Sequence, residues 1–269
     1  MSVAAPAMGR SSRPRGSQLV ARYAPPLVVF VVVVVAWELI AGGPGRRVFP
    51  APSAIYNAAV NNFDYLQRSA LQTIYEAIGG LVIGTLGGIL VAFATARWIT
   101  ARDVLMPIAI ASSAVPIIAI APILNNWFGV LNPVSKMMMA ALLCFFPVMI
   151  NVTRGLVEVQ PASLELMRSY AATELQVLRK LRVPNMLPFL FTALKVGASL
   201  AFIGAIVGEY FGGTSDVLGR VVLTAMSSGS YDLAWAGILI GAVGAIVLFL
   251  VISTVERFAI PWHSSLRAE

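Results

Sequence analysis

Residues 71–95 read LQTIYEAIGGLVIGTLGGILVAFAT, and Glu76 carries the only charge in this stretch. An uninterrupted apolar stretch of this length matches the hydrocarbon core of a bilayer, which about 20 helical residues cross. Glycines at positions 80, 84 and 88 recur every four residues, a spacing that lets two membrane helices approach closely. The stretch predicts a transmembrane helix whose glycines pack either within one chain or between two chains.

Five further stretches share this apolar character. Hydrophobic residues make up 58% of the 269 residues and charged residues 12%, which is the composition of a membrane protein. In lipid the backbone must satisfy its own hydrogen bonds, and stretches of this length do so as helices. We therefore predict an all-α integral membrane protein with six transmembrane helices. The predicted spans are residues 24–42, 71–95, 104–124, 134–151, 187–209 and 234–256.

Polar residues and prolines mark where two of the helices begin. Asn132 followed by Pro133 predicts the start of the fourth span, because the amide can cap the helix and proline suits its first turn. Ser53 follows a proline-rich turn and is placed to cap a short amphipathic helix that ends near Gln67. This helix would precede the second span.

The basic residues predict the orientation in the membrane. Thirteen of the 19 Lys and Arg residues fall in the N-terminal segment, in the loops after the second and fourth spans, and near the C-terminus. Because cytoplasmic loops are enriched in basic residues, both termini are expected in the cytoplasm. The chain then divides into a basic cytoplasmic arm (1–23), a transmembrane domain (24–260) and a cytoplasmic tail (261–269). The enrichment of basic residues on the cytoplasmic side explains the net charge of +7 without a nucleic-acid partner.

Several kinds of site are missing from the sequence. A phosphate-binding P-loop needs a Gly-Lys pair, and none of the three lysines follows a glycine. The single cysteine, Cys144, lies in an apolar stretch, and one histidine, His263, cannot build a multi-histidine metal site. We expect no enzymatic activity, no metal and no cofactor on this chain, so that any ATP and Mg would be bound by another polypeptide.

The polar stretch 152–186 has the pattern of two short helices joined by a turn. Pro161 is suited to start a helix that runs to about Tyr170. Thr173, with a glutamine three residues later, forms a capping box that starts a second helix. That helix is expected to stop before Pro184, because proline disfavours helix at the residue before it. A plain polar loop is the alternative.

The spacing in this stretch resembles the EAA motif of permease subunits of bacterial binding-protein-dependent ABC importers, which are type I importers. The motif reads Glu-Ala-Ala, three residues, Gly, nine residues, Ile-x-Leu-Pro. Ala171 stands at the glycine position, so either the turn is less sharp or docking stabilises it, since a left-handed alanine costs about 1 kcal/mol. The residues that the resemblance assigns to ATPase coupling are Glu165, Leu166, Met167, Arg168, Ala171, Ala172, Thr173, Leu181 and Pro184.

The resemblance extends from about residue 27 to residue 260. Residues 49–53, 114–119, 127–129 and 218–219 are similar, in order, to elements of permeases for taurine, alkanesulfonates and nitrate. Glu76 departs from this pattern, because the resemblance leads us to expect a basic residue in that region of the second span.

The resemblance implies the partners and the activity. Two permease subunits, most simply two copies of this chain, would form the path in the bacterial cytoplasmic membrane, and two ATPase subunits would dock on residues 161–184. An extracytoplasmic binding protein would deliver a sulfonate, taurine, nitrate or a vitamin precursor. An ion-coupled secondary transporter is the main alternative, and a membrane scaffold is a second one.

A second group of residues is expected on the solute path or at an outer gate. The prolines of the third span would free backbone carbonyls there, although kinks that serve packing alone are the alternative. For Asn125, Asn126 and Trp127, which follow this span, the alternative is an ordinary amide-rich loop at the membrane interface. Glu209 is expected at the outer surface, solvated or paired with Arg220. The candidate residues are Pro116, Pro122, Asn125, Asn126, Trp127 and Glu209.

Overall fold

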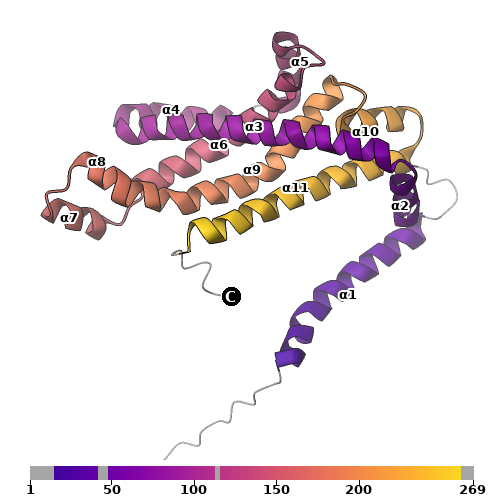
Figure 1. Ribbon diagram of the computed structural model, residues 1–269, viewed down its shortest axis with the longest axis horizontal. Helices are drawn as coiled ribbons and strands as arrows, with labels where there is room; N and C mark the ends of the chain where they lie inside the picture. Colours follow the sequence, from indigo (N-terminus) through magenta and orange to yellow (C-terminus); the bar gives the residue numbers. More distant parts are fainter. Residues whose placement is uncertain (1–14, 42–47, 113–115, 262–269) are drawn as a thin grey trace, which may run out of the picture.

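The computed structural model describes residues 15–41, 48–112 and 116–261. Within these ranges the chain is helical with no strand, and the helices form an elongated bundle from which α1 projects (Figure 1). Five helices are long and apolar enough to cross a membrane, or six if the bent pair α4 and α5 counts as one span. The prediction of an all-α membrane protein with six spans is confirmed.

Helix α1 (Arg15–Ala41) begins earlier than the predicted span, inside the segment predicted to be a basic arm. The first fourteen residues of that arm, and residues 262–269 of the predicted tail, lie outside the described residues. The side chains of the apolar stretch of α1 are mostly exposed, as for Phe30 at 69%. The indole of Trp37 donates to the carbonyl of Pro50 at 3.1 Å and so ties the end of α1 to the start of the bundle.

Helices α2 (Pro52–Asn61) and α3 (Phe63–Arg97) meet at Asn62, so the short helix ends earlier than the predicted Gln67 and the second span begins earlier than residue 71. The predicted cap by Ser53 is also wrong. The residue before the helix is Ala51, and the backbone amide of Ser53 instead donates to Glu38 of α1 at 3.0 Å. Helix α3 is 35 residues long, which places Glu76 well inside it rather than near its end.

The predicted third span is two helices, α4 (Ile99–Ser112) and α5 (Ile117–Phe128). Their axes differ by 99° across residues 113–115, which lie outside the described residues. Pro116 precedes the first residue of α5 and therefore marks a helix start rather than a kink within a continuous span. A proline at this place is compatible with helix because its missing N–H has no partner in a first turn.

Helices α3, α6 (Pro133–Val157) and α9 (Val183–Phe211) form the core. Asn132 caps α6 as predicted, since its side chain accepts from the amide of Val134 at 3.0 Å. The glycines lie where these helices cross. A Cβ atom at Gly80 would lie 2.6 Å from the carbonyl oxygen of Met137, and one at Gly204 would lie 2.5 Å from Cα of Ala140. The glycine spacing therefore packs helices within one chain.

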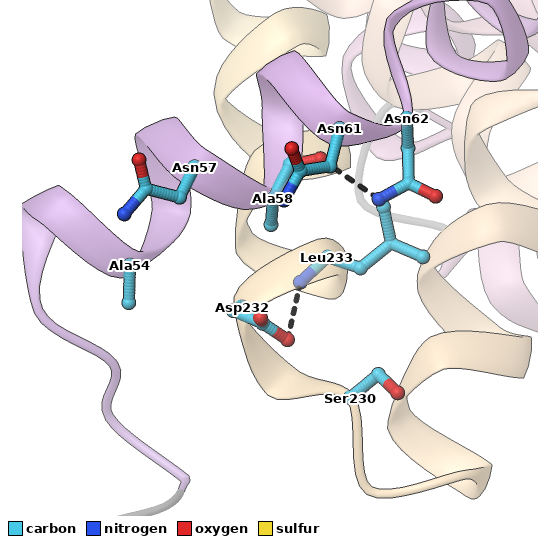
Figure 2. Close-up of a pocket in the computed structure, with 8 residues that line it drawn as sticks. All are labelled: Ala54, Asn57, Ala58, Asn61, Asn62, Ser230, Asp232 and Leu233. Carbon is cyan, nitrogen blue, oxygen red and sulfur yellow. Dashed lines mark hydrogen bonds between the residues drawn. The ribbon is translucent and has the colours of Figure 1, made fainter.

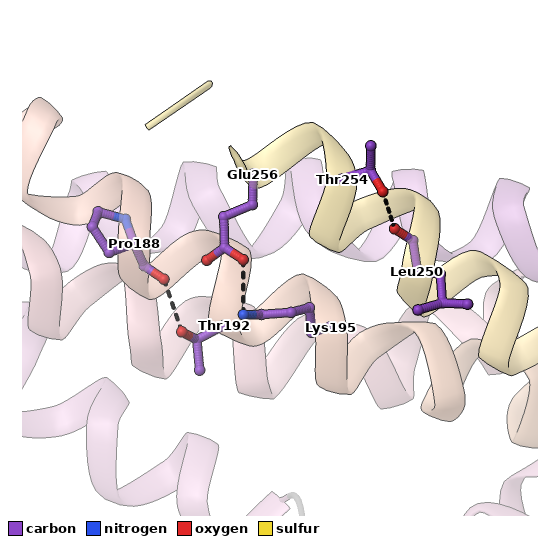
Figure 3. Close-up of polar contacts among 6 residues, drawn as sticks. All are labelled: Pro188, Thr192, Lys195, Leu250, Thr254 and Glu256. Atoms are coloured by element: carbon purple, nitrogen blue, oxygen red, sulfur yellow. Dashed lines mark hydrogen bonds and ion pairs between the residues drawn. The ribbon is translucent and has the colours of Figure 1, made fainter. Parts of the chain in front are cut away.

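Two helices complete the bundle. Helix α10 (Leu218–Ser227) was not predicted, and α11 (Tyr231–Ala259) contains the sixth predicted span. Figure 3 shows an ion pair between α9 and α11, in which Lys195 Nζ lies 2.8 Å from Glu256 Oε2. Both side chains are largely buried, at 26% and 13% exposed, so this pair fixes the end of α11 against α9.

Candidate functional site

Helices α7 (Pro161–Ser169) and α8 (Glu174–Val177) form a helical hairpin at one end of the molecule (Figure 1). We call it the coupling hairpin and define it as residues 161–182. Several of its large side chains are exposed: Leu166 at 57%, Tyr170 at 78% and Leu175 at 53%. Of the coupling residues predicted from sequence, Glu165, Leu166 and Arg168 are exposed on α7. Helix α7 thus presents apolar and charged side chains away from the bundle.

The turn of the hairpin is as sharp as the EAA motif would require. Ala171 has φ +48°, and its amide donates to the carbonyl of Arg168 at 2.9 Å. The amide of Ala172 donates to the carbonyl of Met167 at 3.0 Å. Together these two bonds make a Schellman motif, which usually places glycine at the left-handed position. Because Ala171 adopts this conformation, the alternative of a less sharp turn is wrong. The left-handed backbone costs alanine about 1 kcal/mol relative to glycine.

The predicted capping box is confirmed at the start of α8. The amide of Gln176 donates to the hydroxyl of Thr173 at 3.4 Å, and Gln176 Oε1 accepts from the amide of Thr173 at 2.8 Å. These bonds satisfy two of the amides that a helix start leaves without partners. The hairpin is therefore closed on both sides of its turn by backbone and side-chain bonds.

The prediction that Pro184 ends the second helix is wrong. Residues Leu178–Arg182 form a π-helical turn, and α9 continues directly from it, so that Glu174–Phe211 is one helical stretch of 38 residues. The amide of Val183 donates to the carbonyl of Leu178, five residues earlier. This wider turn makes room for the proline ring, which would clash with the carbonyl four residues before it in a regular α-helix.

Asn185 fixes the hairpin to the bundle, and sequence reasoning missed it. Its amide nitrogen donates to the carbonyls of Gly155 at 2.7 Å and Glu158 at 3.2 Å, at the end of α6. These carbonyls belong to the last turn of α6, where the helix itself offers no partner. The backbones also approach closely here, because a Cβ atom at Gly155 would lie 2.6 Å from Cα of Met186.

The structure separates the residues predicted to form a solute path. Pro116, Pro122, Asn126 and Trp127 are exposed along α5, with Trp127 at 72%. Asn125 is 3% exposed, and neither atom of its amide group has a hydrogen-bond partner among the described residues. The exposed members thus line one face of α5, whereas Asn125 points into the bundle.

Glu209 is neither solvated nor paired with Arg220, and both predicted alternatives are wrong. Its side chain is fully buried, and Oε2 accepts from the amide of Gly219 at 2.7 Å. Gly219 lies in the first turn of α10, so the unpredicted helix covers the end of α9 and buries the carboxyl group. Neither Glu209 nor Arg220 forms an ion pair within the described part of the chain.

Two further charged side chains are buried near Glu209. Glu76 of α3 is 3% exposed, and Lys136 of α6, which lies near the start of the predicted fourth span, is 1% exposed. Lys136 Nζ donates to the carbonyls of Val130 and Asn132, the latter at 3.4 Å. We call Glu76, Lys136 and Glu209 the buried charge cluster; among the residues that the structure describes, none of the three forms an ion pair with another.

A polar pocket of 460 Å³ lies between α2 and the start of α11, at the end opposite the coupling hairpin (Figures 1 and 2). Amide side chains of α2 and its end face the first turn of α11 across this pocket (Figure 2). Asp232 accepts from the backbone amide of Leu233 at 3.0 Å. The residues that line the pocket are Ala54, Asn57, Ala58, Asn61, Asn62, Ser230, Asp232 and Leu233.

Residues 84–262 match the profile of a family described as "Binding-protein-dependent transport system inner membrane component". A probable ABC transporter permease protein of Haemophilus influenzae is 33% identical over 239 residues, which are 88% of this chain and 94% of the relative. The formylaminopyrimidine transport permease protein ThiX of Halalkalibacterium halodurans is 30% identical over 240 residues, 88% and 95% of the two chains.

The fold is also similar to that of a solved transporter. A chain in an inward-facing structure of the MetNI methionine ABC transporter superimposes with a TM-score of 0.56 at 18% sequence identity. The match covers 72% of this chain and 94% of the other. At this identity the likeness concerns the helical arrangement.

Proposed function

Because the chain belongs to the family of binding-protein-dependent transport system inner membrane components and is a permease subunit of an ABC importer, we propose that its coupling hairpin is the surface on which a separate ATPase docks. The observation that carries this proposal is the exposure of Leu166, 57%, on a short projecting helix that ends in a hydrogen-bonded turn. Exposed apolar side chains on a projecting element are typical of protein interfaces. The docking residues would be those assigned by the EAA resemblance, led by Glu165, Leu166 and Met167.

The hairpin is connected to the bundle in a way that suits transmission of a movement. Helix α9 continues from α8 without a break, and Asn185 adds a second link to α6. On its other side α8 borders a pocket of 450 Å³ in front of the end of α3. A displacement of α7 by the ATPase would therefore move α9 first. ATP and Mg would be bound by the ATPase, since this sequence has no P-loop.

The exposed face of α5 supports a path formed by two copies of the chain. Pro116, Pro122, Asn126 and Trp127 lie on it and are not covered by their own chain. A solute path that these residues line must be closed by another molecule, and a second copy is the simplest one. Pro122, which lies inside α5, would expose a carbonyl oxygen to the path, as irregular backbone in membranes does where it borders a cavity.

The distribution of basic residues supports cytoplasmic termini and a cytoplasmic coupling hairpin. The polar pocket between α2 and α11 then faces the outside, where a binding protein would deliver the solute. We propose a small organic or inorganic anion, such as a sulfonate, taurine or nitrate, or a vitamin precursor. The relative named for formylaminopyrimidine transport supports the last class.

Docking is tested by co-purification with the ATPase encoded beside this chain. Leu166→Glu places a charge in the interface, and we expect at least a tenfold loss of bound ATPase, because burying an unpaired charge costs more than about 1.4 kcal/mol. The wild type should co-purify as two permease and two ATPase subunits. Both the amount of ATPase and the mass of the complex are measured.

The matched control is Leu131→Glu, the same substitution at a leucine that is 65% exposed in the loop between α5 and α6. It should retain the ATPase. Equal loss in both variants, or full retention by Leu166→Glu, would show that the coupling hairpin is not the docking surface.

A further inference from the structure

Two buried carboxyl groups each have one oxygen without a donor. Glu76 Oε1 accepts from the side-chain amide of Gln72 at 3.2 Å, and Glu209 Oε2 accepts from the amide of Gly219 at 2.7 Å. Among the described residues, Glu76 Oε2 and Glu209 Oε1 have no hydrogen-bond partner. Their side chains are 3% and 0% exposed, so bulk solvent does not reach these oxygens.

The amide of Leu218 donates to the hydroxyl of Thr73, one turn before Glu76 on α3, and the adjacent amide of Gly219 donates to Glu209 of α9, so the two carboxyl groups meet at the start of α10. Two ionised carboxylates in such contact repel strongly in a buried site, and neither can donate to the other. If one of them is protonated, its O–H supplies the donor that both unsatisfied oxygens lack. We propose that Glu76 and Glu209 form a site for a single proton, which Glu76 carries and donates to the carboxylate of Glu209.

The surroundings determine which residue is ionised. Glu209 lies at the first turn of α10, where the hydroxyl of Thr73 accepts from the amide of Leu218 at 3.0 Å beside the bond from Gly219. The amides of a helix start favour a negative charge. Glu76 has a weaker environment for a charge, because Gln72 on its own helix is its one donor among the described residues. The charge therefore belongs on Glu209 and the proton on Glu76.

The charge balance agrees with one proton. Lys136 on α6 is buried beside the end of α9, because a Cβ atom at Gly208, the residue before Glu209, would lie 3.1 Å from its Cγ. One carboxylate and one ammonium leave the cluster neutral, whereas two carboxylates would leave a net negative charge in a buried site. On α10, Arg220 is partly buried and forms no ion pair with either carboxyl group in the described ranges. The shared proton thus forms a hydrogen bond between Glu76 on α3 and Glu209 on α9, next to α6 and α10.

Infrared spectroscopy of the purified full-length protein in deuterated buffer at neutral pH tests the proposal. The wild type should show the carbonyl stretch of a protonated carboxyl group, and Glu76→Gln should lose it. The control Glu158→Gln removes an exposed acid and should leave the band unchanged. A wild-type spectrum without the band, or a band that survives in Glu76→Gln, would overturn the proposal. So would a band that appears only after sodium is removed, because an alkali cation would then occupy the site.

Thermal unfolding in detergent tests the charge of the cluster independently, with Glu76→Gln and a double variant. Glutamine at position 76 mimics a protonated carboxyl group and should unfold within a few degrees of the wild type. The double variant Glu76→Gln/Glu209→Gln leaves Lys136 without a counter-charge and should unfold at a clearly lower temperature. Single and double variants of equal stability would contradict a cluster that holds one proton and one negative charge.

Discussion

Replacing Gly84 with alanine is expected to prevent accumulation of the folded protein, although the change adds only one methyl group. The Cβ atom would overlap the carbonyl oxygen of Ala141 and lie 3.0 Å from both Cα of Ala141 and Cβ of Cys144. Two of these atoms are backbone, so relief requires α3 and α6 to separate. Overpacking of this kind costs about 1–3 kcal/mol and more where the backbone cannot move.

The matched control lies on the same helix. Alanine at Gly87 would place its Cβ atom 3.4 Å from Cδ2 of Phe145, an ordinary contact with a ring that can shift. Folded yield after size-exclusion chromatography and the unfolding temperature are measured for both variants. If Gly84→Ala accumulates as well as Gly87→Ala, the close crossing of α3 and α6 is wrong.

Replacing Lys136 with methionine is expected to destabilise the protein by about 3–5 kcal/mol, the usual cost of removing one partner from a buried charge cluster. The Lys136 residue is 1% exposed, donates to the carbonyls of Val130 and Asn132, and packs against Gly208, the residue before Glu209. Without it a carboxylate remains buried with no counter-charge. The measurement is the unfolding temperature in detergent.

A second substitution separates the charge from the hydrogen bonds. In Lys136→Met/Glu209→Gln the uncompensated carboxylate is gone, so we expect this variant to be more stable than Lys136→Met alone. The bonds to Val130 and Asn132 stay lost, and the rescue should therefore be partial. A double variant that is less stable than Lys136→Met would show that the two residues do not share a charge balance.

Features that depend on neighbouring residues in the sequence could be predicted. The apolar stretches predicted the number and approximate places of the membrane spans, because a span needs about 20 apolar residues whatever it packs against. Asn132 and Thr173 act as caps, as predicted, since a cap bonds to amides two or three residues away. The spacing of the coupling motif placed the turn at Ala171 but left its sharpness open, and the structure shows the left-handed conformation, with φ +48°.

Features that depend on distant packing could not be predicted. Glu209 was placed at the surface because α10 was missed, and ten residues reading LGRVVLTAMS are too short to signal a span. Lys136 lies near the start of the predicted fourth span, where a lysine is usually solvated, and its burial was not predicted. Only the fold brings it beside Glu76, whose place in the sequence lies 60 residues away.

The error at Pro184 has a different cause. Proline disfavours a preceding helix when the helix is regular, but a π turn at Leu178–Arg182 widens the backbone and lets the helix continue. No residue in this turn identifies it from sequence. Asn185 was missed for a similar reason, because an asparagine near a helix start does not reveal that its amide reaches Gly155 and Glu158 of another helix.

Uptake by proteoliposomes tests the central claim most directly. The liposomes contain this chain and its ATPase, the binding protein is added outside with radiolabelled taurine, an alkanesulfonate, nitrate or a vitamin precursor, and ATP is enclosed. We predict accumulation of one of these solutes that requires ATP and is lost in Leu166→Glu. Accumulation that proceeds without ATP and follows an imposed proton or sodium gradient would contradict an ATP-driven importer and identify an ion-coupled carrier instead.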